Sequence, residues 1–284
     1  ITNVAIIEKG WIGGGNVGRN TTIIRSNYMY DENALFSEFG MDLWRKMSQD
    51  LNYNVMFSPR GIINLAHSDA QMNAYARRGN SMRLNGIDAV LLNREEVKNK
   101  VPILDFSDNV RFPIFGGLMQ PSAGTARHDA VAWGYAKGAT QRGVELHQLT
   151  EVVDVITENN RVTGVKTNRG TVNCGCVVQA VAGHSSIVGA MAGIKMPITT
   201  YPLQAMVTQP VKPFLDPLVS SSALHCYVQQ TGRGEIVFGG GSDPYPLYNT
   251  RSTLDLKESL LASAIEMFPF MANLKLMRQW AGIT

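Results

Sequence analysis

The chain has 284 residues, of which 44% are hydrophobic and 17% are charged, and its formal net charge is +3. This length allows a sizeable core and one or two domains. Because the charge is nearly balanced and no cluster of Lys and Arg stands out, nucleic acid and anionic membranes are not expected as main partners. No apolar run approaches the roughly 18 residues of a membrane-spanning helix.

The chain contains three cysteines, which are too few to indicate a disulfide framework. This usage fits a reducing compartment and predicts a cytoplasmic protein. Cys174 and Cys176 form a C-x-C pair inside an apolar run, and no second pair completes a zinc site. We therefore interpret both as buried strand residues and predict no metal site.

The first predicted element is a short strand at residues 4–7, an apolar run typical of a parallel strand buried on both faces. Glu8 follows it directly. A carboxylate at the end of such a strand accepts hydrogen bonds from the ribose hydroxyls of a bound dinucleotide. The stretch therefore predicts a nucleotide-binding element in which Glu8 binds a ribose.

A glycine-rich loop comes next, in which Gly13, Gly15 and Gly18 spell the pattern G-x-G-x-x-G. That motif needs a helix directly after it, because the helix N-terminus faces the pyrophosphate. The residues that follow, RNTTIIRSNY, show no helical spacing of apolar side chains. We therefore place Glu8 on the second strand of the nucleotide fold. The first strand and its glycine motif are expected to precede Ile1 and to be missing, and the literal motif is the less favoured alternative.

The next part of the chain predicts alternating helices and strands. A helix is expected over 31–51, with one apolar face that is formed by Leu35, Phe36, Phe39, Leu43 and Met47. The other elements expected before residue 122 are a pair of short strands in 57–67, a helix at 69–84, a short helix after a cap at 93–96, and a strand with a turn in 109–121.

The second half of the chain is richer in strands. A helix over 127–142 ends at Gly143. The elements expected after it are strands at 144–148, 150–156, 161–167 and 171–180, a helix at 182–191, strands alone from 197 to 241, a helix at 253–268 and a last strand at 276–282.

A three-stranded meander that interrupts a βαβ region indicates two interleaved domains of an α/β (α+β two-domain) protein. We expect the cofactor-binding domain to comprise 1–58, 118–194 and 275–284, and to be incomplete. An α+β substrate domain with an antiparallel sheet is expected over 59–117 and 195–274.

Four strings carry a resemblance to a known family: RNTTIIRSNY at 19–28, GTARHDAVAWGYAKGA at 124–139, AVAGHSSIVGAMAG at 180–193 and YPLQAMVT at 201–208. With these strings in this order, the chain resembles the β subunits of heterotetrameric sarcosine oxidases, in the amino-acid-oxidase group of flavoenzymes. The resemblance implies a Rossmann-like FAD/NAD(P)-binding domain interleaved with an antiparallel-sheet substrate domain, the arrangement of the amino-acid-oxidase type.

The resemblance also implies two flavins, a noncovalent FAD and an FMN that is bonded covalently to a histidine at the border with the α subunit. His128, preceded by Arg127, matches that histidine. A neutral imidazole is nucleophilic enough to bond the activated 8-methyl carbon of a flavin. Without the family string, His128 would be an ordinary histidine at a helix N-terminus.

Three residues are expected on the substrate side of the active site, and two of them match positions of the family. Arg25 matches the arginine that binds the substrate carboxylate, for which a planar guanidinium is well suited. A surface arginine after a strand is the alternative. His225 matches an active-site histidine, and Tyr227 shares its strand face, although an ordinary buried strand histidine is the competing interpretation. A lysine that shares the site in simpler relatives would fall beyond Thr284.

The resemblance assigns further residues to FAD. They are Glu8, Lys9, Asn20, Thr21, Thr22, Val152, Ala182, Gly183 and His184. Glu8 would bind the ribose, Val152 would offer its backbone to the adenine, and the 182–184 turn would approach the flavin. Because the glycine motif and a last flavin loop are expected outside this chain, we expect weak FAD binding and no activity of this chain alone.

The function implied by the resemblance is FAD-dependent oxidative demethylation of sarcosine to glycine, with electrons passed to covalent FMN and dioxygen to give hydrogen peroxide. The imine would yield formaldehyde or methylenetetrahydrofolate. Partners would be the α, γ and δ subunits. Two alternatives stay open: a related amino-acid or glycine oxidase without covalent FMN, and a non-catalytic assembly subunit.

Overall fold

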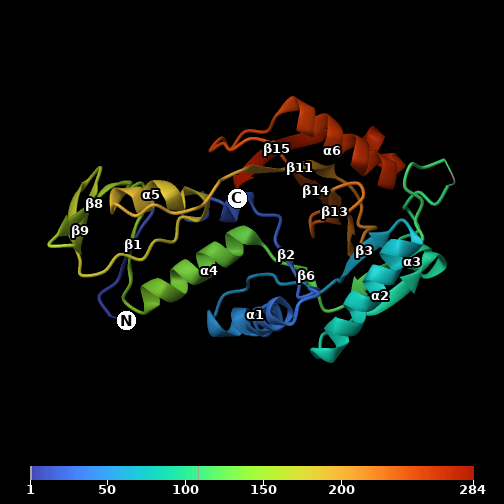
Figure 1. The fold of residues 1–284 in the computed structure, drawn as a ribbon, viewed down its shortest axis with the longest axis horizontal. Coiled ribbons are helices and arrows are strands. Elements are labelled where there is room, and N and C mark those ends of the chain that lie inside the picture. The colour runs from blue at the N-terminus through green and yellow to red at the C-terminus, as the bar shows by residue number, and fades with distance from the viewer. Residues whose placement is uncertain (1, 108) are drawn as a thin grey trace.

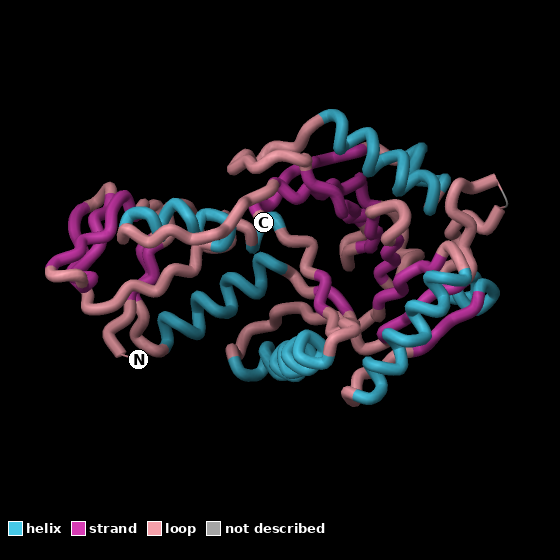
Figure 2. Tube along the Cα trace, in the orientation of Figure 1, coloured by secondary structure: helices cyan, strands magenta, loops and turns pink. Residues whose placement is uncertain are grey.

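The structure is a computed structural model that describes residues 2–107 and 109–284 (Figure 1). Two unlike regions lie at opposite ends of the molecule. One is a large mixed sheet covered by helices, and the other holds a short parallel strand pair and a three-stranded meander. Helix α4 (His128–Gln141) runs between them, and Figure 2 shows long loop segments that join the two regions.

The large sheet has eight strands in the order β15-β11-β14-β13-β12-β3-β5-β4. Their bounds are β3 (Ile62–Ala66), β4 (Val90–Asn93), β5 (Gly116–Gln120), β11 (Pro202–Pro210), β12 (Leu218–Ser221), β13 (Cys226–Gln230), β14 (Glu235–Ser242) and β15 (Leu276–Ile283). The pair β3–β12 is parallel, and the other pairs are antiparallel. Most of these strands are rich in β-branched and other apolar residues, which pack well on a pleated surface.

The main core lies between one face of this sheet and the helices α3 (Arg94–Lys100) and α6 (Leu254–Met267). Ile63, Met206 and Phe238 are completely buried in it. Full burial of a side chain of this size contributes roughly 1.5–3 kcal/mol relative to exposure. The large sheet is therefore a self-supporting unit around which the remaining elements are arranged.

Helices α1 (Asp31–Asp50) and α2 (Asp69–Leu84) pack on a second, smaller cluster that contains Ala34, Tyr75 and Leu118. Helix α2 begins where predicted, because the Ser68 side chain accepts a hydrogen bond from the backbone of Gln71. Helix α3 begins with a capping box between Asn93 and Glu96, which confirms the cap predicted at 93–96.

The small-sheet region comprises residues 2–19 and 128–194. It contains β1 (Ala5–Ile7) paired in parallel with β7 (Glu145–His147), the antiparallel meander β8 (Val152–Glu158), β9 (Arg161–Thr167) and β10 (Gly170–Asn173), and helices α4 and α5 (Ser185–Met191). The meander and the parallel pair confirm the predicted pattern. Two short 3₁₀ helices of this region lie at Val17–Arg19 and Ala182–His184, and a third, Pro269–Asn273, follows α6 in the large-sheet region.

A two-stranded link, β2 (Ile23–Ile24) and β6 (Gly124–Thr125), lies between the two regions. The glycine-rich loop before it leads into the 3₁₀ turn and not into an α-helix, as expected from its sequence. Strand β15 pairs with β11 in the large sheet, although the expected domain division places 275–284 with the cofactor domain. The division itself stays a prediction.

Two expectations about buried strands are wrong. The strand expected at 171–180 ends at Asn173, Val178 is 82% exposed, and Cys176 is exposed. Cys174 still donates its backbone N–H to the Thr163 carbonyl of β9 at 3.0 Å. Among the described residues no strand pairs with 175–181, so the rest of the apolar run joins no ladder. Strand β1 is also not buried on both faces, because Ile6 is 46% exposed and β1 pairs only with β7 within the described residues.

The apolar face expected on helix α1 faces mainly outward. Four of its five residues are exposed, namely Leu35, Phe36, Phe39 and Leu43. The fifth, Met47, is buried together with Ala34 and Met41. Spacing along a helix defines a face but not what covers it. The sequence analysis also missed β4, and the first of the two strands expected in 57–67 is reduced to a single bridge between Ser58 and Thr125.

Candidate functional site

The end of β1 gathers several of the residues assigned to a nucleotide. One Glu8 carboxylate oxygen accepts the Gly10 backbone N–H at 2.7 Å, which fixes the side chain directly after the strand. Partial burial, and secondly the nearby charge of Lys9, lower the pKa of His184. Glu8, Lys9 and the turn at Ala182–His184 therefore belong to one neighbourhood.

The glycine-rich loop is anchored to the last strand of the large sheet. The Ile283 backbone N–H donates to Asn16 Oδ1 at 2.9 Å, and the Asn16 amide donates back to the Ile283 carbonyl. Trp280 Nε1 donates to the Arg19 carbonyl at 2.8 Å. A Cβ added at Gly18 would lie 2.2 Å from the Gly13 carbonyl oxygen, so the loop closes on itself only because residue 18 is glycine.

Residues Thr21 and Thr22 are held from two sides. The Thr22 hydroxyl donates to the Ala126 carbonyl at 2.6 Å, and Gln229 Nε2 donates to the Thr21 carbonyl at 2.6 Å. Burial raises the pKa of Tyr227 to about 12, and the nearby Thr21 side chain opposes this shift. Tyr227 and Gln229 are two residues apart in β13 and therefore lie on the same face of the strand. This spacing could have identified Gln229 from the sequence once Tyr227 was assigned to the site.

Arg25 follows this anchored stretch, and its guanidinium has a fixed direction. Arg25 Nη1 donates to Asn27 Oδ1 at 2.6 Å, and the guanidinium carbon lies 4.6 Å from the centre of the Tyr28 ring. Ser26, which is completely buried, receives a hydrogen bond from Gln120 Nε2 at 2.6 Å. In the described part of the chain no carboxylate lies within 4 Å of the Arg25 guanidinium. Sequence analysis missed these buried amides because nothing in their local pattern marks them.

His225 lies just before β13 and is exposed, so the interpretation as a buried strand histidine is wrong. Its backbone has a φ of 46°, in the left-handed region that residues other than glycine seldom adopt. Thr22 and Ala182, both assigned to FAD, have φ values of 53° and 46°. Backbone strain of this kind concentrates at ligand sites, and three of the assigned residues carry it.

His128 is the first residue of α4, and its Nδ1 is buried with no hydrogen-bond partner among the described residues. Burial is the main cause that lowers the pKa of His128, which favours the neutral imidazole. Arg127 Nη2 donates to Asp129 Oδ2 at 2.7 Å, and this bond is the main cause that lowers the pKa of Asp129 to about 2. The imidazole is thus uncharged, with an unused ring nitrogen, beside an ion pair.

Val152 opens β8, at an irregularity in the pairing with β9 between Val152 and Asp154. It lies in the meander, away from the link that carries Arg25 (Figure 1). The residues assigned to FAD thus extend from the meander through the end of β1 to β2. Within the described part of the chain, no three His, Cys, Asp or Glu side chains gather in a way that would hold a metal ion.

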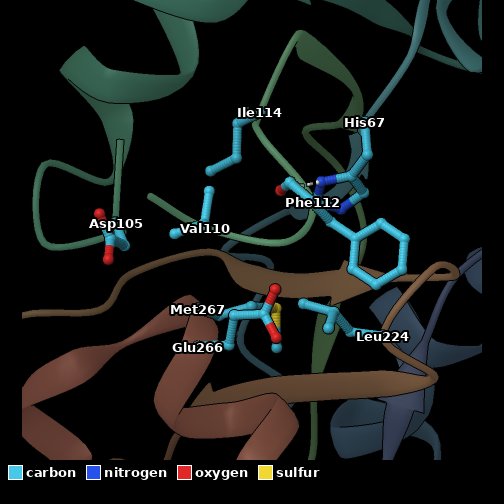
Figure 3. A pocket seen from close by; sticks show the side chains of 8 residues that line it. All are labelled: His67, Asp105, Val110, Phe112, Ile114, Leu224, Glu266 and Met267. Atoms are coloured by element: carbon cyan, nitrogen blue, oxygen red, sulfur yellow. Dashed lines mark hydrogen bonds between the residues drawn. The ribbon is translucent and has the colours of Figure 1, made fainter. Parts of the chain in front are cut away.

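A separate pocket lies in the large-sheet region around His67 (Figure 3). His67 Nδ1 lies 2.8 Å from the Phe112 carbonyl oxygen, and Nε2 lies 2.8 Å from Ser221 Oγ. Both ring nitrogens are therefore engaged in protein hydrogen bonds, which is a structural arrangement. None of the residues assigned from the sequence lines this pocket.

The whole chain is similar to known flavoenzymes. The sequence profile described as "FAD dependent oxidoreductase" matches residues 2–284. The chain is 52% identical over 283 residues to sarcosine oxidase subunit beta of Rhizobium meliloti, covering 100% of this chain and 68% of the relative. It is 44% identical over 283 residues to the subunit of the same name from an Arthrobacter species, covering 70% of that protein.

Solved structures share the fold. The crystal structure of L-proline dehydrogenase from P. horikoshii superposes with a TM-score of 0.90 at 31% identity, covering 99% of this chain and 74% of that one. Glycine oxidase from Geobacillus kaustophilus gives a TM-score of 0.85 at 20% identity, covering 99% and 75% of the two chains, and supports the fold alone. The expected α/β fold of the amino-acid-oxidase type is confirmed.

Proposed function

The chain belongs to the FAD-dependent oxidoreductase family, and from this membership we propose that it acts as the β subunit of a sarcosine oxidase. The observation that carries the proposal is the identity of 44% to 52% with three such subunits, each over 283 residues. The reaction is oxidative demethylation of sarcosine to glycine. The geometry around Arg25 and β1 supports the proposal independently of the names of the relatives.

The residues at the end of β1 fit the polar part of FAD. An ionised carboxylate offers about four lone-pair positions. Glu8 uses one oxygen for the Gly10 N–H at 2.7 Å and keeps acceptor capacity for ribose hydroxyls. The Ala182–His184 turn and the Thr21–Thr22 segment would contact the rest of the cofactor, together with Lys9, Asn20 and Val152. When bound, FAD supplies the acceptor for the hydride equivalent removed from the amine.

Arg25 binds and orients the substrate in this proposal. Its guanidinium is fixed by Asn27 at 2.6 Å and lies over the Tyr28 ring, but it has no carboxylate partner within 4 Å in the described residues. A substrate carboxylate could accept two parallel hydrogen bonds from the Arg25 guanidinium. Fixing the carboxylate places the N-methyl group in one direction, and such positioning lowers the barrier of the reaction. Tyr227 and His225 complete the substrate side.

His128 is the proposed attachment residue of a covalent FMN, with Arg127 beside it. The buried Nδ1 without a partner and the lowered pKa support this role, since a neutral ring nitrogen can bond to a flavin carbon. Mass spectrometry of the peptide around His128, taken from the assembled complex, should show the mass of FMN. An unmodified peptide would favour the alternative, a related amine oxidase without covalent FMN.

The partners and products belong to the same proposal. An FMN held at His128 would supply the route by which electrons reach dioxygen to give hydrogen peroxide, and the methyl group would leave as formaldehyde or methylenetetrahydrofolate. The relatives are named as subunits, which supports assembly with α, γ and δ subunits. None of the helices in the described residues is long and apolar enough to cross a membrane. A cytoplasmic location stays a prediction.

The decisive experiment measures sarcosine oxidation by the assembled complex with Arg25→Gln. Hydrogen bonds to charged groups contribute roughly 1.5–3 kcal/mol, so kcat/KM should fall by about 10-fold to 100-fold. The matched control is Arg161→Gln, which removes an exposed arginine of β9 and should leave kcat/KM unchanged. Wild-type complex that oxidises another amino acid, such as proline, and not sarcosine would identify a related oxidoreductase. No oxidation at all would identify an assembly subunit.

A further inference from the structure

A second guanidinium lies close to Arg25. Arg78, on α2, is half-buried, and its Nε is buried with no hydrogen-bond partner among the described residues. Burial lowers the pKa of Arg78, and the charge of Arg25 adds to this effect. No carboxylate of the described residues lies within 4 Å of either guanidinium. Two like charges in a partly desolvated place are unfavourable unless an anion joins them.

Two asparagines connect the two guanidinium groups. Arg25 Nη1 donates to Asn27 Oδ1 at 2.6 Å, Asn27 Nδ2 donates to Asn64 Oδ1 at 2.7 Å, and Arg78 Nη2 donates to the same oxygen at 3.3 Å. Asn27 and Asn64 are buried. Because an amide carries no net charge, this chain of hydrogen bonds positions both cations without neutralising either of them.

The cluster lies on the face of the large sheet that carries Tyr227. Asn64 is opposite Ser220 in the parallel pair, and Ser220 is opposite Tyr227 in the next pair. Side chains directly opposite each other share a face. Neighbouring strands are about 4.8 Å apart, so the Cα atoms of Asn64 and Tyr227 lie about 10 Å apart. A substrate that contacts Tyr227 would therefore lie on the same sheet face as the Asn64 amide, to which Arg78 donates.

We propose that Arg78 is a further cation of the substrate-carboxylate site, paired with Arg25 through Asn27 and Asn64. The inference rests on the proposed function, since it assigns the partner of the pair as the carboxylate of an amino-acid substrate. Two guanidinium groups bind one carboxylate more tightly and fix its orientation better than one group does. Arg78 therefore determines affinity for carboxylate-bearing amines.

The test uses the assembled, flavin-loaded complex and two variants of adjacent arginines. Arg78→Gln should raise the KM for sarcosine about tenfold, with kcat changed less than about threefold, because one charge-assisted hydrogen bond to the carboxylate is lost. Acetate has a carboxylate but no amine, and its Kd from calorimetry should rise by the same factor. The control Arg77→Gln removes the same charge from an exposed position of the same helix and should leave both values unchanged.

Equal KM and equal acetate Kd in the two variants would overturn the proposal. If Arg78→Gln does not fold, the variant Asn64→Asp tests the proposal. It places a carboxylate between the two cations, which should neutralise them and weaken acetate binding by about tenfold or more. Unchanged acetate binding in that variant would also overturn it. A wild-type complex that does not oxidise sarcosine but binds acetate in an Arg78-dependent manner would refute the proposed function and leave the anion site intact.

Discussion

The large-sheet region and the small-sheet region are stabilised in different ways. The large sheet completely buries Ile63, Met206 and Phe238. In the small-sheet region Ile6 is 46% exposed and Val178 is 82% exposed. Apolar burial is the main stabilising contribution to a fold, so the large sheet is the stable body of the chain. The small-sheet region leaves more of its apolar side chains exposed, and ligands that bind its folded form would stabilise it by mass action.

The residues assigned to the substrate lie near the link between the two regions, and buried polar groups take the place of apolar packing there. Ser26, Asn27 and Gln120 are all 1% exposed or less. Satisfied buried networks of this kind rigidify a segment and specify one conformation. The stable sheet therefore supplies a rigid support, and Asn64 and Tyr227 of the candidate site lie on one face of it.

The largest expected effect is on stability in the large sheet. Phe238→Ala should lower the free energy of unfolding by roughly 3–5 kcal/mol, because it opens a cavity in a fully packed core. Ile6→Ala, at an exposed position of β1, should change it by less than about 1 kcal/mol. Urea denaturation followed by circular dichroism measures both. Equal losses would contradict the distinction between the two regions.

An intermediate effect is expected in the pH dependence of stability. Burial is the main cause that lowers the pKa of His67 below 6.5 in the folded chain. Between that lowered value and pH 6.5 the unfolded chain binds more protons, so the free energy of unfolding should fall as the pH falls through this window. His67→Gln should flatten the dependence.

The control for this prediction is His147→Gln, since His147 is exposed and pairs with Glu145 on the surface. Chemical denaturation at pH 5.5 and pH 7.5 gives the slopes. If His67→Gln and the wild-type chain lose stability equally on acidification, His67 does not control this behaviour.

The smallest expected effect concerns thiol reactivity. Cys226 lies in β13 of the large sheet, and burial raises its pKa to about 12, so native protein should leave it unmodified by iodoacetamide. Cys176 is exposed in the segment 175–181, which pairs with no described strand, and should react. Peptide mass spectrometry distinguishes the two sites, and modification of Cys226 without denaturant would show that the large sheet opens more readily than its packing indicates.

Local sequence determined much of this protein. Local patterns located α2 and α6, and the cap at 93–96 located α3. Turns rich in Asn and Gly located the meander, and the absence of helical spacing after Gly18 ruled out a helix there. These features depend on neighbours within a few residues, and such neighbours are present in the sequence itself. The family strings gave the fold class and the assigned cofactor residues.

Tertiary structure alone decided what covers each element. It left the apolar face of α1 exposed, and within the described residues it left 175–181 without a pairing strand. It also connected Arg25 to Arg78 through Asn27 and Asn64. Arg25 and Arg78 lie 53 positions apart in sequence. Burial and hydrogen bonding at that separation depend on how distant segments pack, and no local pattern of residues encodes such packing.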